Sequence, residues 1–249
     1  GGGPAGSMAA LEASKAGLKV CLLEKTNKIG SKFRCGEAMS LSALKYFFDI
    51  KKEWVSKEIS YCNINSPSGV KLRTKFKNDK CLILDRERFD YDLSLMAEDE
   101  GCDIFTNSIA KDLIIKDDYI TGLIVEKENE ERKINAKLVI AADGIESRLG
   151  RKAGIRTQVK MKDMASGIEY FLDDIDIDSD ALDMYVGSNL APGGYLWIFP
   201  KSERSANIGL AISGKYSSHK SAKRYLDGFI KKKIHRSITK SCASQCLRF

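Results

Sequence analysis

Apolar residues near the start of the chain predict a helix followed by a buried strand. Residues 7–16 are rich in alanine and are followed by Gly17, a residue type that commonly ends helices, so a helix is predicted there. The apolar run 18–24 (LKVCLLE) predicts a strand. A turn, a helix and a strand in this order form the second half of a βαβ unit, and another helix is predicted over 37–50.

The spacing of apolar residues changes in the middle of the chain. Short alternating stretches within 59–84 predict antiparallel hairpins rather than another crossover. Residues 86–100 carry apolar side chains at helical spacing, whereas 109–126 alternates as a hairpin does. A short buried strand is predicted over 138–142, where it leads into an Asp-Gly turn.

The rest of the chain returns to strands separated by turn-rich segments. Four strands are predicted, over 166–172, 182–186, 195–199 and 206–212. A basic helix is predicted over 218–233, and 236–249 has no recognisable pattern. The predicted fold class is therefore α/β, with a Rossmann-type nucleotide-binding domain beside a β-sheet domain.

The composition narrows the class of protein without choosing a function. With 249 residues, 43% of them hydrophobic, the chain can bury one large core or two modest ones. A net charge of +7 suits anionic cofactors, lipid headgroups or nucleic acid alike. Seven cysteines without a CxxC pair predict free thiols in a reducing, cytosolic compartment. No apolar run reaches the ~20 residues of a membrane span, so any membrane contact is expected to be peripheral.

A glycine-rich turn at the start of the chain predicts a dinucleotide site. Gly1, Gly3 and Gly6 fit the GxGxxG pattern, which permits a tight turn and close approach of a pyrophosphate to a helix N-terminus. Glu24 ends the next strand, at the spacing where a carboxylate binds ribose hydroxyls. The chain begins on the first glycine, so the preceding strand is expected to lie outside the sequence and the chain to be truncated.

Three other segments contain residues that could act in catalysis or binding, and each also has an ordinary structural explanation. The run 34–38 (RCGEA) sets the Cys35 thiol beside a carboxylate, although a single cysteine is more often an inert buried residue. Arg86 at a helix start suits either a phosphate or ring contact or a local ion pair. Asp143 and Gly144 fit an ordinary turn as well as a flavin contact.

An aromatic stripe marks the third of the later strands. Strand alternation places Tyr195, Trp197 and Phe199 on one face, where three rings form a broad apolar wall. A packed core sheet is the usual cause of such a stripe. The two glycines before the strand and Pro200 at its end leave room for a ligand to approach the backbone.

Several chemistries find no support in the sequence. The only histidines, His219 and His235, lie in the late basic region, so neither histidine catalysis nor a metal site is predicted. The serine elbow, the Walker loop and the kinase signature are absent from the sequence, which leaves hydrolase and kinase functions without a basis.

Six segments in order resemble the geranylgeranyl reductase family of FAD proteins, with archaeal digeranylgeranylglycerophospholipid reductases as the most similar type. They are GGGPAG, LLEK, RCGEA, LDRERFD, AADG and PGGYLWIFP. RCGEA and the YxWxFP element are the most specific, whereas GxGxxG and the Asp-Gly pair also occur in many flavin hydroxylases. The resemblance extends to about Leu226, and the tail 236–249 does not resemble the family.

The resemblance implies a role for each motif. The cofactor-binding residues that it implies are Gly1, Gly3, Ala5, Gly6, Glu24, Lys25, Arg34, Cys35, Arg86, Asp143 and Gly144. The catalytic residues that it implies are Cys35, Tyr195 and Trp197. Cys35 would lie near the flavin isoalloxazine, while Tyr195 and Trp197 would line the cavity for an isoprenoid chain.

The same resemblance implies an organisation and a function. A hydroxylase-like FAD-binding domain is expected over 1–58 and 85–160, a β-sheet substrate domain over 59–84 and 161–235, and an unassigned tail over 236–249. The expected reaction is FAD-dependent saturation of geranylgeranyl double bonds in isoprenoid ether lipids. The alternatives are a flavin-dependent monooxygenase, which uses the flavin to activate oxygen, and a non-catalytic fragment.

Partners follow from that reaction. An isoprenoid lipid is the expected substrate, and NAD(P)H or ferredoxin the expected electron donor, so a reductant protein is a candidate partner. The expected location is the cytoplasm, with peripheral contact to the membrane, and nucleic acid is not an expected partner.

Overall fold

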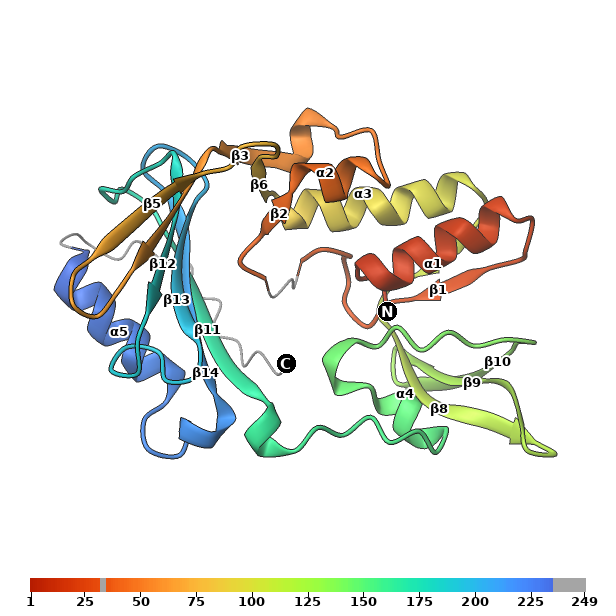
Figure 1. The fold of residues 1–249 in the computed structure, drawn as a ribbon. Coiled ribbons are helices and arrows are strands. Elements are labelled where there is room, and N and C mark those ends of the chain that lie inside the picture. The colour runs from red at the N-terminus through yellow and green to blue at the C-terminus, as the bar shows by residue number, and fades with distance from the viewer. Residues whose placement is uncertain (32–34, 235–249) are drawn as a thin grey trace. The chain divides into compact units, whose positions relative to one another are not determined.

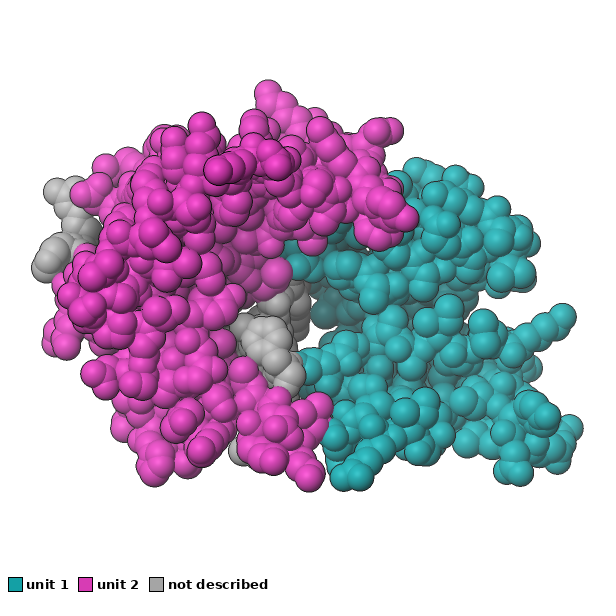
Figure 2. Space-filling model, viewed as in Figure 1, with its two compact units in different colours: residues 1–33, 86–158 teal, residues 34–85, 159–249 magenta. Residues whose placement is uncertain are grey.

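The computed structural model describes residues 1–31 and 35–234, which form two compact units. Of the described residues, unit 1 contains 1–31 and 86–158, and unit 2 contains 35–85 and 159–234, coloured teal and magenta in Figure 2. Within the described residues, no helix combines the length and the apolar character needed to cross a bilayer.

Unit 1 begins with the expected helix and strand. Its first elements are α1 (Pro4–Lys15), β1 (Cys21–Leu23), α3 (Arg86–Asp99) and β7 (Asp103–Phe105). Proline suits the first turn of α1 because that position needs no hydrogen-bonding N–H, so the helix starts three residues earlier than predicted. β1 pairs in parallel with β7, and a core around Leu11, Leu22 and Ala97 holds α1, α3 and β1 together.

The rest of unit 1 is an antiparallel meander. It contains β8 (Ser108–Lys116), β9 (Tyr119–Lys127), β10 (Glu130–Asn135) and the short helix α4 (Arg148–Lys152) (Figure 1). The two-residue turns 117–118 and 128–129 have positive φ at both positions, the geometry that joins twisted antiparallel strands. These turns use Asp, Glu and Asn, and the predicted hairpin over 109–126 is confirmed.

The strand predicted over 138–142 is absent from the structure. A strand needs a hydrogen-bonded neighbour, and no strand pairing reaches this segment among the described residues. Leu138 and Ile140 are accordingly 74% and 58% exposed instead of buried.

Unit 2 is built on a six-stranded sheet in the order β11-β14-β13-β12-β4-β5. Its strands are β4 (Tyr61–Asn65), β5 (Lys71–Lys75), β11 (Ala165–Leu172), β12 (Ala181–Val186), β13 (Tyr195–Pro200) and β14 (Ala206–Ser213). All neighbours are antiparallel except β12 and β4. Helix α5 (Ala222–Lys233) lies along this sheet next to β11 and β14 (Figure 1), with Leu226 and Phe229 in a core that includes Leu210. The four late strands and the helix are confirmed.

A second, smaller sheet belongs to the same unit. It consists of β2 (Ala38–Ser40), β3 (Val55–Ile59) and β6 (Cys81–Leu84), with β6 in the middle. Ile59 and Ile83 from this sheet pack in one cluster with Trp197 and Phe199 of β13. The segment between β2 and β3 contains the helix α2 (Leu41–Lys45) and a single helical turn at Lys52–Trp54. Elsewhere in unit 2, single helical turns are formed by Met161–Asp163 and Gly214–Tyr216.

This small sheet corrects one prediction. The helix expected over 37–50 is a short strand followed by the five-residue α2, because Ala38–Ser40 hydrogen-bonds to β6. Residues 35–58 lie in unit 2 of the structure, while the expected FAD-binding domain over 1–58 and 85–160 stays a prediction. Both β2 and β3 pair with β6, and these pairings hold the segment in unit 2. That one unit binds FAD and the other the substrate stays a prediction.

Candidate functional site

The glycine turn of unit 1 is tightly packed at one glycine and open at another. A Cβ on Gly6 would lie 1.9 Å from the Gly1 carbonyl oxygen and 3.3 Å from the Ala142 Cβ, so only glycine fits there. A Cβ on Gly3 would meet nothing within 4 Å. The backbone at Gly3, the N-cap of α1, is therefore accessible to a ligand, and the Ala-Asp-Gly segment lies against the same turn.

Glu24 faces this turn as an ionised acceptor. One of its carboxylate oxygens accepts the Gly2 N–H at 2.8 Å, and the other accepts the N–H and hydroxyl of Thr26, each at 2.8 Å. Burial by itself would raise the pKa of Glu24, but these hydrogen bonds outweigh it and hold the pKa below its ordinary value. Glu24 is thus charged at neutral pH beside the turn, as the predicted ribose contact requires.

The other residues predicted in unit 1 have local roles in the structure. Arg86 donates from Nε and Nη2 to the two carboxylate oxygens of Asp90, both at 2.8 Å. Of the two roles considered for Arg86, a ligand contact or a local ion pair, the structure contains the ion pair. Asp143 accepts the Leu149 N–H at 2.8 Å, and Gly144 has the positive φ of a turn residue. Ala5 and Lys25 are exposed. Contacts of these five predicted residues with FAD stay predictions.

The residues of unit 1 fit the adenine dinucleotide part of FAD. The N-terminus of α1 offers unpaired backbone N–H groups and a positive dipole end, and its first turn contains no acidic side chain. Gly3 leaves the approach to these groups open, and Glu24 supplies a charged acceptor 21 residues along the chain. Donors for phosphates on the glycine turn and an acceptor for ribose hydroxyls at the end of β1 therefore lie next to each other.

In unit 2, the turn that contains Cys35 packs against the aromatic stripe. A Cβ on Gly36 would lie 2.9 Å from the Phe199 ring and 3.3 Å from Trp197 Nε1, so the backbone of the turn touches both side chains. The ring centroids of Tyr195 and Trp197 are 5.8 Å apart, and those of Trp197 and Phe199 are 6.0 Å apart. The predicted aromatic wall is confirmed.

The three predicted catalytic residues differ in their access to a ligand. Cys35 is half-buried, and its Sγ accepts the Glu37 N–H at 3.3 Å. Tyr195 is 38% exposed, whereas Trp197 is only 4% exposed beneath its neighbours. Of the two aromatic residues predicted to line a cavity, Tyr195 is therefore the accessible one in this structure. Arg34, a predicted cofactor contact, lies outside the described residues.

Three polar residues that the sequence did not single out lie around the Cys35 turn and its Glu37. They are Glu169, Lys201 and Asn207. Glu169 and Asn207 stand in otherwise apolar strands, where a lone polar side chain signals a buried hydrogen-bond network. That signal was available in the sequence, but the partners of these residues depend on strands far apart along the chain.

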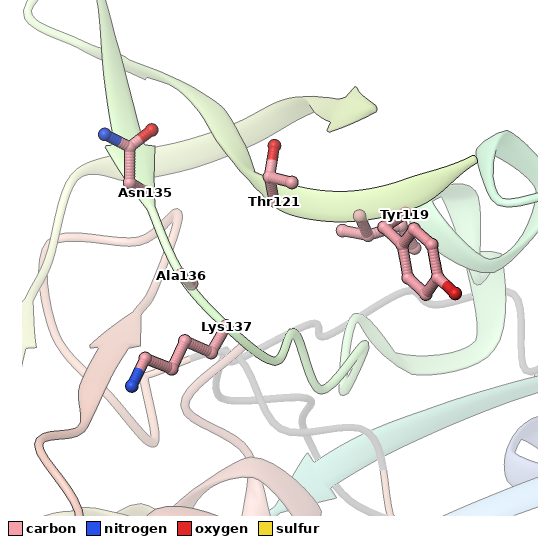
Figure 3. Close-up of a pocket in the computed structure, with 6 residues that line it drawn as sticks. Tyr119, Thr121, Asn135, Ala136 and Lys137 are labelled. Atoms are coloured by element: carbon pink, nitrogen blue, oxygen red, sulfur yellow. The ribbon is translucent and has the colours of Figure 1, made fainter. Parts of the chain in front are cut away.

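A shallow depression on the meander of unit 1 lies apart from all the predicted residues of that unit. It is lined by Tyr119, Ile120, Thr121, Asn135, Ala136 and Lys137. Figure 3 shows the labelled side chains spread along two strand ends instead of converging on one point. We assign it no chemistry, because convergent polar groups are what a small-molecule site requires.

Two family models match the chain. FAD dependent oxidoreductase matches residues 1–195, and the geranylgeranyl reductase catalytic domain matches residues 163–245. The second match runs into the tail 236–249, so the expectation that this tail does not resemble the family was wrong. The tail itself lies outside the described residues.

Individual proteins agree with the family models. A digeranylgeranylglycerophospholipid reductase of Methanoculleus marisnigri is 40% identical over 243 residues, which is 96% of this chain and 61% of the relative. A geranylgeranyl bacteriochlorophyll reductase-like structure from Thermoplasma acidophilum has a TM-score of 0.88 and 35% identity, covering 100% of this chain and 64% of that one. The chain thus spans about three fifths of the length of such relatives.

A second similar structure, a flavin-dependent brominase, shares the fold alone. Its TM-score is 0.79 at 17% identity, over 100% of this chain and 67% of the brominase. The predicted resemblance to a flavin hydroxylase-like fold and to geranylgeranyl reductases is therefore confirmed. From its fold, its glycine turn and these matches, we conclude that the chain belongs to the family of FAD-dependent oxidoreductases and contains geranylgeranyl reductase catalytic-domain sequence.

Proposed function

We propose that this protein saturates carbon–carbon double bonds in the geranylgeranyl chains of isoprenoid ether lipids, with FAD as its cofactor. The observation that carries the proposal is the match of residues 163–245 to the geranylgeranyl reductase catalytic domain. The match covers the strand with Tyr195 and Trp197, against which the Cys35 turn packs. Similar reductases at 38% and 40% identity are named for this class of lipid substrate.

Unit 1 supplies the proposed cofactor site. Gly1, Gly3 and Gly6 shape the turn at the N-terminus of α1, where backbone N–H groups bind the pyrophosphate. Glu24 accepts hydrogen bonds from the ribose. Ala5, Lys25, Arg34, Arg86, Asp143 and Gly144 are the further proposed contacts. The chemistry that bound, reduced FAD would supply is the delivery of a hydride to one carbon of the double bond, and a proton from water or an acidic group would complete the other carbon.

Unit 2 supplies the proposed substrate site. Tyr195 is the accessible part of a proposed apolar wall that Trp197 supports from beneath, and this wall excludes water and binds an isoprenoid chain by contact with its methyl groups. Cys35, on the turn beside this wall, is the proposed catalytic side chain because its thiol is the titratable group of that turn with access to solvent. NAD(P)H or ferredoxin provides the electrons. We also propose that the protein works in the cytoplasm and touches the membrane peripherally, because its substrate is a membrane lipid.

Product analysis tests this function. The purified protein is loaded with FAD, reduced chemically without oxygen and incubated with a digeranylgeranyl ether lipid, and the product is weighed by mass spectrometry. A gain of two hydrogens per double bond is the expected result. A gain of oxygen after air is admitted would identify a monooxygenase, and an unchanged lipid would reject this substrate class.

A further inference from the structure

A buried polar network lies beneath the Cys35 turn in unit 2. Glu37, Glu169, Trp197 and Asn207 are each no more than 4% exposed, and Lys201 joins them through an ion pair. They come from the turn, β11, β13, β14 and the segment after β13. Burying so many polar groups is unfavourable unless each finds a hydrogen-bond partner, and the contacts in this network provide such partners.

Asn207 joins the two parts of the proposed substrate site. Its Oδ1 accepts the indole N–H of Trp197 at 2.9 Å. Its Nδ2 lies 3.4 Å from the Cys35 carbonyl oxygen, 3.4 Å from Glu37 Oε2 and 3.3 Å from Glu169 Oε2. An amide offers two hydrogens and a carbonyl oxygen, so one side chain engages the ring and the turn together.

The backbone of β14 also confines the Trp197 ring. Gly209 pairs with Trp197 across the sheet, and a Cβ there would lie 2.3 Å from the Trp197 ring atom Cζ2. Gly36 lies close to the same indole, near Nε1. The ring is therefore fixed by close contacts at two glycines and oriented by its hydrogen bond to Asn207.

Glu37 adopts a backbone conformation that its side-chain partners stabilise. Its φ of 69° is in the left-handed region, which non-glycine residues rarely adopt, although a glycine stands immediately before it. Lys201 Nζ donates to Glu37 Oε1 at 2.5 Å and to the Leu84 carbonyl oxygen at 3.2 Å, while the Leu84 N–H donates to the Glu37 carbonyl oxygen at 2.9 Å. In this conformation the Glu37 N–H points at the Cys35 sulfur.

We propose that Asn207, Glu37 and Lys201 are positioning residues that hold the Cys35 thiol and the Trp197 indole in a fixed relation. Asn207 orients the indole and binds the turn, whereas the Glu37–Lys201 pair keeps the turn in the conformation that directs an N–H at the sulfur. The catalytic meaning of this arrangement rests on the proposed function. The arrangement itself does not, and it can be measured without FAD or lipid.

The test uses two local readouts in a Trp54→Phe background. The sequence has two tryptophans, so Trp197 then provides all the tryptophan fluorescence. The alkylation rate of Cys35 by iodoacetamide, followed by peptide mass mapping, reports on the turn separately from the other cysteines. Asn207→Leu is expected to shift the Trp197 emission maximum and to accelerate Cys35 alkylation several-fold, because it frees both groups.

Two further variants separate the roles. Asn207→Asp keeps an oxygen acceptor for the indole but loses the donors to the turn, so Cys35 alkylation should accelerate while the Trp197 emission stays in place. Lys201→Met removes the ion pair of Glu37 and leaves the hydrogen bond between Asn207 and Trp197 in place. It should therefore accelerate Cys35 alkylation without shifting the Trp197 emission. This variant tests the proposal even if Asn207→Leu does not fold.

The matched control is Asn63→Leu, which removes another fully buried asparagine from the same sheet. Asn63 donates to Asp178 and not to the Cys35 turn, so its loss should lower stability without moving either readout. The proposal is overturned if folded Asn207→Leu and Lys201→Met leave both signals unchanged, or if Asn63→Leu changes them equally.

Activity measurements then connect the network to the reaction. If the proposed function holds, Asn207→Leu should lower kcat for the lipid more than it raises KM, because alignment of the reacting groups and not lipid binding is lost. Equal effects on both parameters would reject the link to catalysis. A protein that reduces no lipid at all fails the proposed function, while the fluorescence and alkylation results still decide the positioning role.

Discussion

The two turns that carry the candidate chemistry are built in opposite ways. The glycine turn of unit 1 presents backbone N–H groups and open space at Gly3, and the Glu24 carboxylate accepts a hydrogen bond from it. The Cys35 turn of unit 2 is fixed by buried side chains, above all Glu37 and Asn207. A site made of backbone donors depends on the absence of side chains, whereas a site made of buried side chains depends on each partner being present.

The largest expected effect is at the buried ion pair of the Cys35 turn. Lys201→Met leaves the carboxylate of Glu37, whose side chain is 1% exposed, without its ammonium partner. Removing one member of a buried pair costs about 3–5 kcal/mol of unfolding free energy, to be measured by urea denaturation. The exposed pair Lys15–Glu12 is the control, where Lys15→Met should change stability by about 0.5 kcal/mol or less. Equal losses at both sites would contradict the contrast between the turns.

The next effect is at the glycine turn and concerns binding. Gly6→Ala places a methyl group 1.9 Å from the Gly1 carbonyl oxygen, so the turn must open. We expect FAD affinity, measured by flavin fluorescence titration, to fall about 100-fold, or about 2.7 kcal/mol. Gly3→Ala meets no protein atom and should leave the fold intact while it weakens FAD binding. Normal FAD binding by Gly6→Ala would exclude this turn as the pyrophosphate site.

A third prediction concerns the packing of Trp197. Gly209→Ala would place its methyl group 2.3 Å from the Trp197 ring and 2.7 Å from the Ile168 carbonyl oxygen, so unfolding free energy should fall by about 1–3 kcal/mol. Gly228→Ala in α5 should have the opposite effect on stability, because a Cβ added there would meet no atom within 4 Å. It should stabilise the protein by about 0.5–1 kcal/mol. Thermal unfolding of the pair checks both signs, and a neutral Gly209→Ala would show that the ring is not confined.

The smallest expected effect is the pH dependence contributed by Glu24. Its hydrogen bonds lower the pKa in the folded state, so the stabilisation is present above the ordinary pKa of 4.5 and is lost as pH falls through the folded value. The stability difference between the wild type and Glu24→Gln should therefore be largest at neutral pH and shrink in acid. Urea unfolding at several pH values measures it. A difference that grows on acidification would reverse the assigned sign.

Local patterns of the sequence predicted much of the fold correctly. The helices near 7–16 and 86–100 and the hairpin over 109–126 depend on contacts between residues close in the chain, and all three are present. The strand over 138–142 failed because strand formation needs a neighbour that the apolar run itself does not specify. The helix over 37–50 failed for the related reason that pairing with β6 competes with helical hydrogen bonds.

The candidate residues also divide into those that a local sequence pattern marks and those that depend on long-range contacts. Motifs indicated Gly3 and Glu24, which lie in unit 1, and Cys35 and Trp197, which lie in unit 2. The roles of these four residues toward FAD and substrate stay predictions. The motifs missed Asn207, because nothing local marks it except its polarity in an apolar strand.

By itself the sequence determined the glycine turn, the carboxylate after the next strand and the aromatic stripe, since each depends on residue type at short spacing. Only the tertiary structure decided that the Cys35 turn packs against Trp197 through Gly36 and that Asn207 binds both the turn and the indole. The contact between Gly36 and Trp197 and that between Asn207 and Cys35 join residues more than 150 positions apart, and such pairs meet only when the sheets of unit 2 assemble. Side-chain patterns encode faces and turns, whereas the partners across a core are fixed by the packing of whole strands.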